Sequence, residues 1–154
     1  MGVSITAYKN IKFLAKEIDW DNIGKDEIGL YKVGFDRSDG FSEGTYSFTD
    51  EFTIMSKSYG GYNIWRNNLC GAVHSFQAQY LWDHREFEGF QALAFYELID
   101  FSDCEGFLGP YTCSKLLADF KGYEEDLKIS EVDYVDEWII GLEMVAGNGV
   151  VKFS

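Results

Sequence analysis

The sequence has little proline, few cysteines and no long apolar run. A single proline, Pro110, excludes a proline-rich stalk or linker. The three cysteines, Cys70, Cys104 and Cys113, are an odd number at spacings that match no metal site, which is typical of free thiols in a reducing cytosol. Uncharged apolar stretches stay well below the ~18 residues of a membrane span, and lysines from Lys9 onward interrupt any signal-peptide core. We therefore expect a cytoplasmic protein without a membrane partner.

Positive charge is also scarce. Lys and Arg number 13 against 26 Asp and Glu, which gives a net charge of −13. So acidic a chain repels phosphate backbones, and this excludes direct binding to nucleic-acid backbones through a broad basic face. Apolar residues at 46% and aromatic residues at 18% exclude a disordered acidic tail. The composition predicts one folded domain spanning residues 1–154.

Hydrophobic spacing predicts an α+β fold. Strands are expected at residues 3–9, 28–33 and 150–153, with a hairpin formed by 45–48 and 52–55. Helical spacing follows at residues 64–73, 92–99, 110–127 and 132–145. The first of these helices would bury one face, formed by Ile64, Trp65, Leu69, Ala72 and Val73. We expect a small mixed or antiparallel sheet, made from the N-terminal half and the C-terminal strand, packed with three to four helices.

Several sequence islands stand out together. They are MGVSITAY at 1–8, SYGGYNIWR at 58–66, FYELIDFSDCEG at 95–106 and GVVKF at 149–153. In combination they resemble a widespread family of uncharacterised bacterial and phage proteins with an MGLDISAY-like start and SYGGYNxWR and FxELIxFSDCEG motifs. Asp100 departs from the family pattern, which has Asn there. The resemblance implies a shared fold over nearly the whole chain and leaves the activity open.

The strongest candidate for a binding site is the glycine pair Gly60-Gly61 at the start of a helix. Exposed amides at a helix start favour an anion, and Arg66 on the next turn could hold a phosphate or carboxylate by two hydrogen bonds. Lys115 would add a second positive charge. Together with the 102–105 loop, the predicted ligand-binding residues are Tyr59, Gly60, Gly61, Tyr62, Asn63, Arg66, Ser102, Asp103, Glu105 and Lys115. The competing interpretation makes Tyr62 core, the glycines a tight turn, and Arg66 a structural partner of Asp103 or Glu105.

Acidic residues cluster at Glu97, Asp100, Asp103 and Glu105. Crowded carboxylates can supply a general acid beside a base, and Asp103 and Glu105 are the candidate catalytic residues. The same oxygens could bind a divalent cation, or neutralise Arg66 and Lys115. Ser102 could instead cap a turn. The neutralising role is favoured.

Cysteine and histidine chemistry has weaker support. Cys104 lies between two carboxylates, which disfavour its thiolate. Cys70 and His74 stand four residues apart, as two zinc ligands on one helix would, but two further ligands would have to converge from elsewhere. The sequence predicts no metal site and no cofactor.

Three functions follow from these observations. The first is a binding module for a small anionic molecule. In the most specific version of this hypothesis, the molecule is derived from a nucleotide and the protein sequesters it in phage counter-defence. The second is a hydrolase that uses Asp103 or Glu105 as acid and base. The third is an interaction protein whose acidic surface docks a basic partner or mimics nucleic acid. The binding module is the favoured hypothesis.

Overall fold

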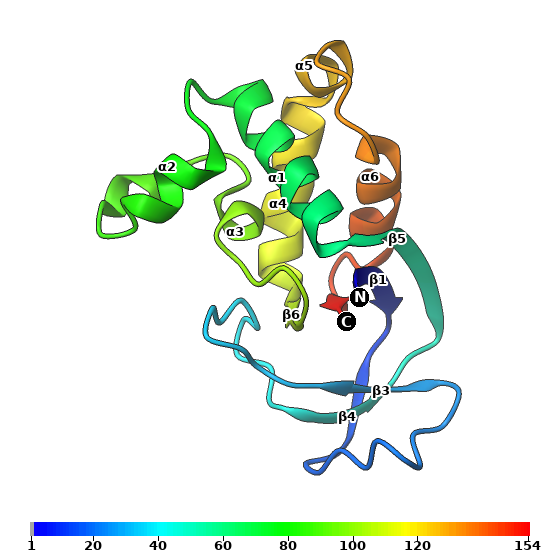
Figure 1. Cartoon of the computed structure of the whole chain (residues 1–154). Coiled ribbons are helices and arrows are strands. Elements are labelled where there is room, and N and C mark those ends of the chain that lie inside the picture. Colours follow the sequence, from blue (N-terminus) through cyan, green and yellow to red (C-terminus); the bar gives the residue numbers. More distant parts are fainter. Residues whose placement is uncertain (1) are drawn as a thin grey trace.

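A computed structural model describes residues 2–154, which form two antiparallel sheets, six α-helices and one 3₁₀-helix (Figure 1). The α+β prediction is confirmed. The larger sheet has the strand order β5-β1-β7-β6. Its members are β1 (Gly2–Lys9), β5 (Asp50–Ser58), β6 (Gly106–Leu108) and β7 (Gly149–Phe153). The predicted strands at both ends of the chain are therefore neighbours, with β1 antiparallel to β7.

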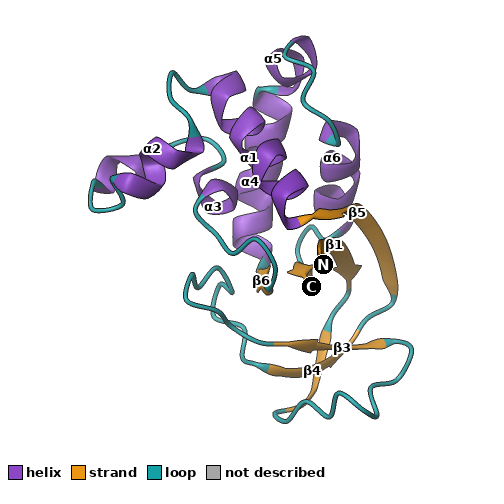
Figure 2. Ribbon diagram, viewed as in Figure 1, coloured by secondary structure: helices purple, strands orange, loops and turns teal. Residues whose placement is uncertain are grey.

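Alternation along β1 decides which face of this sheet is covered. Val3, Ile5 and Ala7 are buried and point to one side, together with Val151 and Phe153 of β7. Three longer helices pack on that side: α1 (Tyr59–Val73), α4 (Pro110–Gly122) and α6 (Val135–Met144) (Figure 2). The shorter helices are α2 (Ala78–Asp83), α3 (Tyr96–Ile99), α5 (Glu124–Ile129) and the 3₁₀-helix η1 (Glu88–Ala92).

Stacked aromatic rings form the centre of this main core. Trp65 of α1 lies parallel to Trp138 of α6 with 5.8 Å between ring centroids, and Trp138 stacks in turn on Phe120 at 5.6 Å. Trp138 and Phe120 are fully buried. The three long helices are thus joined through ring contacts that bury large apolar areas.

The smaller sheet lies below the larger one in Figure 1. Its strands are β2 (Lys12–Ala15), β3 (Glu27–Leu30) and β4 (Gly44–Ser47), in the order β2-β4-β3. A second buried cluster joins it to the outer face of the larger sheet, where Ile28, Leu30 and Tyr46 meet Phe107 of β6 and Val150 of β7. The larger sheet is therefore covered by helices on one side and by the smaller sheet on the other.

The predicted hairpin of 45–48 and 52–55 is wrong. Both segments are strands, but β4 pairs with β2 and β3, whereas β5 pairs with β1. At the crossing, the Thr49 amide donates to the Lys9 carbonyl at 3.0 Å, which directs the chain onto β1. A local turn signal does not specify the partner of the following strand, because the pairing is set by which apolar faces can be buried.

The buried face of α1 also differs from the prediction. Trp65 and Leu69 are buried as expected, but Ile64 is 65% exposed. The buried face contains Tyr62 and Arg66 instead. The helix is rotated toward Tyr62 because its large ring fills the space over β7, where it meets Phe153 edge-on at 6.0 Å.

Candidate functional site

The glycine pair lies inside the first turn of α1. Ser58 is the N-cap residue, and its hydroxyl accepts a hydrogen bond from the Gly61 amide at 3.0 Å. Gly60 has open space where a side chain would be. One of the amides expected to face a ligand is thus occupied by the cap.

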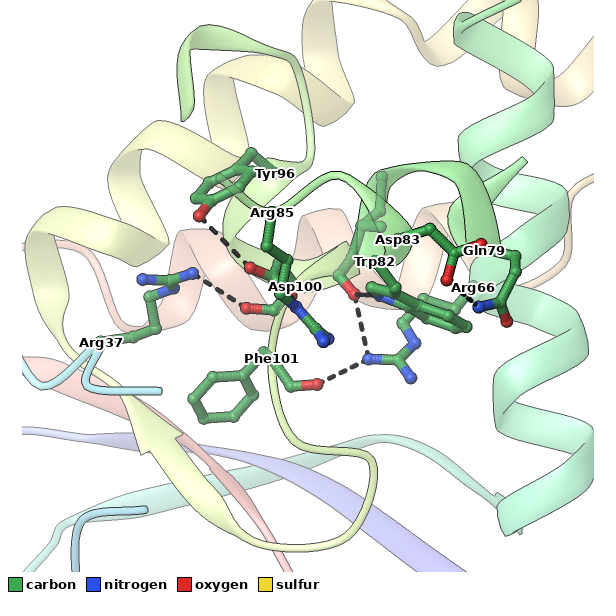
Figure 3. Close-up of polar contacts among 10 residues, drawn as sticks. Arg37, Arg66, Gln79, Trp82, Asp83, Arg85, Tyr96, Asp100 and Phe101 are labelled. Atoms are coloured by element: carbon green, nitrogen blue, oxygen red, sulfur yellow. Dashed lines mark hydrogen bonds and ion pairs between the residues drawn. The ribbon is translucent and has the colours of Figure 1, made fainter. Parts of the chain in front are cut away.

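Arg66 does not face an open cleft, and this part of the prediction is wrong. Its side chain is buried, with 5% exposed. Nη1 donates to the carbonyls of Ile99 at 3.1 Å and Phe101 at 2.7 Å (Figure 3), and Nη2 donates to the Asn63 amide oxygen. Trp82 lies 4.8 Å from the guanidinium carbon, and desolvation lowers the pKa of Arg66. The guanidinium therefore fastens α1 to the segment after α3.

The two predicted segments do come together, but polar side chains fill the contact. Asn63 Nδ2 donates to Asp103 Oδ2 at 3.0 Å across 40 residues of sequence. Ser102 Oγ accepts from the amides of Cys104 at 3.3 Å and Glu105 at 3.2 Å, which confirms the turn-capping alternative. Asn63 is therefore the link between Arg66 and the acidic loop.

Lys115 lies in a separate cluster. Its ammonium contacts Glu97 at 2.8 Å, Asp119 at 2.7 Å and the Leu93 carbonyl at 2.8 Å. The neutralising interpretation of the acidic residues is confirmed for Glu97. Lys115 is thus occupied by partners on α3 and α4.

The remaining predicted site residues either pack in the hydrophobic core or bind partners in different places. Tyr62 is fully buried and stacks on Trp65 at 5.7 Å, and Tyr59 is half-buried against the same core. The candidate catalytic carboxylates are held by different partners, Asp103 by Asn63 and Glu105 by Tyr31.

All three arginines of the chain converge on residues 99–101 (Figure 3). Besides Arg66, Arg37 Nη2 donates to the Asp100 carbonyl at 2.9 Å, and Arg85 Nε pairs with the Asp100 carboxylate at 2.7 Å. Asp100 is 4% exposed. Sequence reasoning placed Asp100 in an acidic cluster but did not find Arg37 and Arg85, because neither residue lies near it in the chain. The arrangement is a charge-assisted brace for this segment.

A separate cavity of about 500 Å³ opens at the edge of the smaller sheet, beside the outer face of β7. Its lining residues are Ile18, Trp20, Tyr31, Lys152 and Ser154. None of these residues was predicted as part of a site. They come from three separate stretches of sequence and form no local motif.

Trp20 reaches the cavity because Gly29 has no side chain. A Cβ at Gly29 would stand 2.7 Å from Trp20 Cη2 and 2.6 Å from Ile18 Cγ2, so only glycine lets the indole lie across β3. Trp20 meets Tyr31 edge-on at 5.8 Å and remains 56% exposed. Trp20 and Tyr31 therefore form an aromatic wall of the cavity, and the indole of Trp20 is exposed there.

Lys152 supplies the positive charge in the cavity. It alternates with buried Val151 and Phe153 on β7, and its Nζ lies 5.3 Å from the Trp20 ring. Within residues 2–154, Lys152 forms no ion pair. Burial lowers the pKa of Lys152 because the ammonium loses hydration that no carboxylate replaces.

Tyr31 lines the cavity and is hydrogen-bonded to Glu105 outside it. Tyr31 Oη donates to Glu105 Oε2 at 3.1 Å. The pKa of Tyr31 is raised, first by burial and then by this hydrogen bond. Glu105, predicted from sequence as a site residue, therefore contacts a lining residue but does not itself line the cavity.

The chain matches no family model, and no curated protein and no solved structure is significantly similar to it. The family resemblance of the sequence islands therefore stays a prediction. Over the part of the chain that the structure describes, no helix is both long and apolar enough to cross a bilayer. No three His, Cys, Asp or Glu residues among 2–154 gather in a way that could hold a metal ion.

Proposed function

We propose that this protein is a binding module for a small anionic molecule that carries a planar ring, and that the ligand occupies the cavity of Trp20, Tyr31 and Lys152. The observation that carries the proposal is the unpaired ammonium of Lys152 inside a chain of net charge −13. A desolvated charge without a partner costs free energy, and an entering anion would offset that cost. Six of the ten lysines form no ion pair within residues 2–154, and Lys152 is the one of these six that lines this cavity.

The ligand class follows from the lining. Trp20 offers an indole surface on which a base or another flat ring can stack, and Lys152 offers one positive charge. A cavity of about 500 Å³ lies within the usual range for small-molecule sites. A nucleotide or nucleotide-derived signalling molecule combines a flat base with phosphate. Sequestration of such a molecule, in the phage setting that the sequence resemblance implies, is the most specific form of the proposal.

The experiment is a thermal-shift screen of the full chain with nucleoside monophosphates, cyclic dinucleotides and aromatic carboxylates, followed by calorimetric titration of any compound that stabilises it. Lys152→Gln should weaken binding about tenfold through loss of one charge-assisted contact. Trp20→Ala should weaken it through loss of stacking.

Lys57→Gln is the matched control. Its Nζ also lies 5.3 Å from an aromatic ring, that of Tyr134, but Lys57 does not line the cavity. The proposal fails if no compound in the panel stabilises the wild type, or if Lys152→Gln binds as tightly as Lys57→Gln. Product formation during the titration, lost in Asp103→Asn, would favour the hydrolase instead.

A further inference from the structure

A segment between α1 and α3 carries an aromatic surface distinct from the cavity. Residues 74–90, here the aromatic arm, include α2 and the start of η1 and project to one side of the helical layer (Figures 1 and 2). The arm contains six ring contacts closer than about 6.2 Å between centroids. The rings belong to His74, Phe76, Tyr80, His84, Phe87 and Phe90, which include both histidines of the chain.

Two of these rings are exposed to solvent and pack against a ring that is buried. Phe90 is 8% exposed and packs 5.5 Å from Phe76, whereas Tyr80 is 50% exposed and Phe87 is 60% exposed. Phe87 meets Phe90 edge-on at 5.1 Å, and Tyr80 stacks with His84 at 4.2 Å. The exposed rings are therefore anchored at their inner edges, as contact residues at protein interfaces are.

The backbone holds the exposed rings in place before any partner arrives. A Cβ at Gly89 would stand 2.7 Å from Phe87 Cε1, so the ring lies directly against a glycine. The Phe87 amide donates to the His84 carbonyl at 3.0 Å, and His84 Nδ1 donates to the Tyr80 carbonyl at 2.7 Å. A preorganised surface loses less conformational entropy on binding.

The charge of the arm indicates what binds there. Asp83, Glu86 and Glu88 are exposed next to the rings. The arm's single arginine, Arg85, is already paired with buried Asp100 at 2.7 Å (Figure 3). Aromatic faces beside carboxylates suit a guanidinium, which stacks on a ring and donates to a carboxylate at once.

We propose that the aromatic arm docks an arginine-bearing segment of a partner protein, with Tyr80 and Phe87 stacking on guanidinium groups and Glu86 and Glu88 accepting their hydrogen bonds. Arginine is preferred to lysine here because its planar cation can use the ring face and the carboxylate together. The surface is separate from the cavity, so this inference does not depend on the proposed small ligand.

The test is fluorescence anisotropy of a labelled octapeptide in which arginine alternates with glycine, titrated with the full chain at about 0.15 M salt, where exposed charges beyond about 8 Å are screened. The lysine–glycine peptide of equal charge should bind more weakly. Phe87→Ala and Tyr80→Ala should each weaken arginine-peptide binding by about threefold to tenfold. Glu86→Gln should weaken it and reduce its salt dependence.

Tyr111→Ala is the matched control, because Tyr111 is 78% exposed and belongs to α4 rather than to the arm. It should bind the arginine peptide as the wild type does. Equal affinity for the two peptides would overturn the proposal, because it would show attraction by net charge alone. Loss of affinity in Tyr111→Ala equal to that in Phe87→Ala would overturn it too, as would absence of binding by the wild type.

Discussion

Replacing Arg66 with methionine should destabilise the protein strongly while leaving the proposed ligand cavity intact. Arg66 makes two charge-assisted hydrogen bonds to carbonyls, at 3.1 and 2.7 Å. Hydrogen bonds to charged groups contribute about 1.5–3 kcal/mol each. The Ile99 carbonyl keeps a second donor, Trp82 Nε1 at 2.9 Å, whereas the Phe101 carbonyl and the Asn63 amide oxygen would lose their donor. Methionine also removes the desolvation cost of a buried cation, which offsets part of the loss.

The expected result is a decrease of about 2–4 kcal/mol in the free energy of unfolding. Urea denaturation at pH 7, followed by circular dichroism, measures it. Arg66→Lys should lose about half as much, because an ammonium lacks the planar fork that reaches both carbonyls and Asn63. Lys121→Met is the control. Its ion pair with Glu143 at 3.0 Å is half-exposed on both sides, and its removal should change stability by less than about 1 kcal/mol.

An Arg66→Met variant as stable as Lys121→Met would refute the assignment of Arg66 as a structural brace. A second refuting result is loss of ligand binding in folded Arg66→Met protein with stability unchanged. That outcome would restore Arg66 to the ligand site that the sequence predicted.

Three further predictions concern other parts of the chain. Lys152→Met should raise the free energy of unfolding by about 0.5–1 kcal/mol at neutral pH, because it removes an unpaired desolvated charge. The pKa of Lys152 is lowered in the folded protein, so the unfolded chain binds more protons between the folded pKa and about 10.4. As pH rises through this window, the free energy of unfolding of the wild type should therefore increase relative to that of the variant. Urea titrations at several pH values measure this difference. Gly29→Val should displace Trp20 and increase acrylamide quenching of tryptophan fluorescence; unchanged quenching would contradict the packing of the indole over β3. Under native conditions iodoacetamide should modify Cys104 before Cys113, whose thiol is buried with a raised pKa, and mass spectrometry showing the reverse order would count against this fold.

Local sequence patterns were sufficient for the elements whose burial follows one simple period. Alternation identified β1, and Pro110 marked the start of α4. The same reasoning failed for the 45–55 region, because both strands were recognised but their partners lie in different sheets. It failed for Ile64 because helical spacing permits several adjacent faces, and packing of Tyr62 selected the one that is buried.

The sequence by itself determined the α+β class, the excess of negative charge and the meeting of the 58–66 and 102–105 segments. Only the tertiary structure decided that Arg66 would be enclosed by carbonyls, because those carbonyls become available where α3 ends against α1. It also decided that Trp20 and Lys152 would share a cavity, because two sheets had to pack before these residues could meet. Periodicity indicates which side of a helix or strand is buried. The partners of a charged side chain come from segments that are distant in sequence, so no local pattern predicts them.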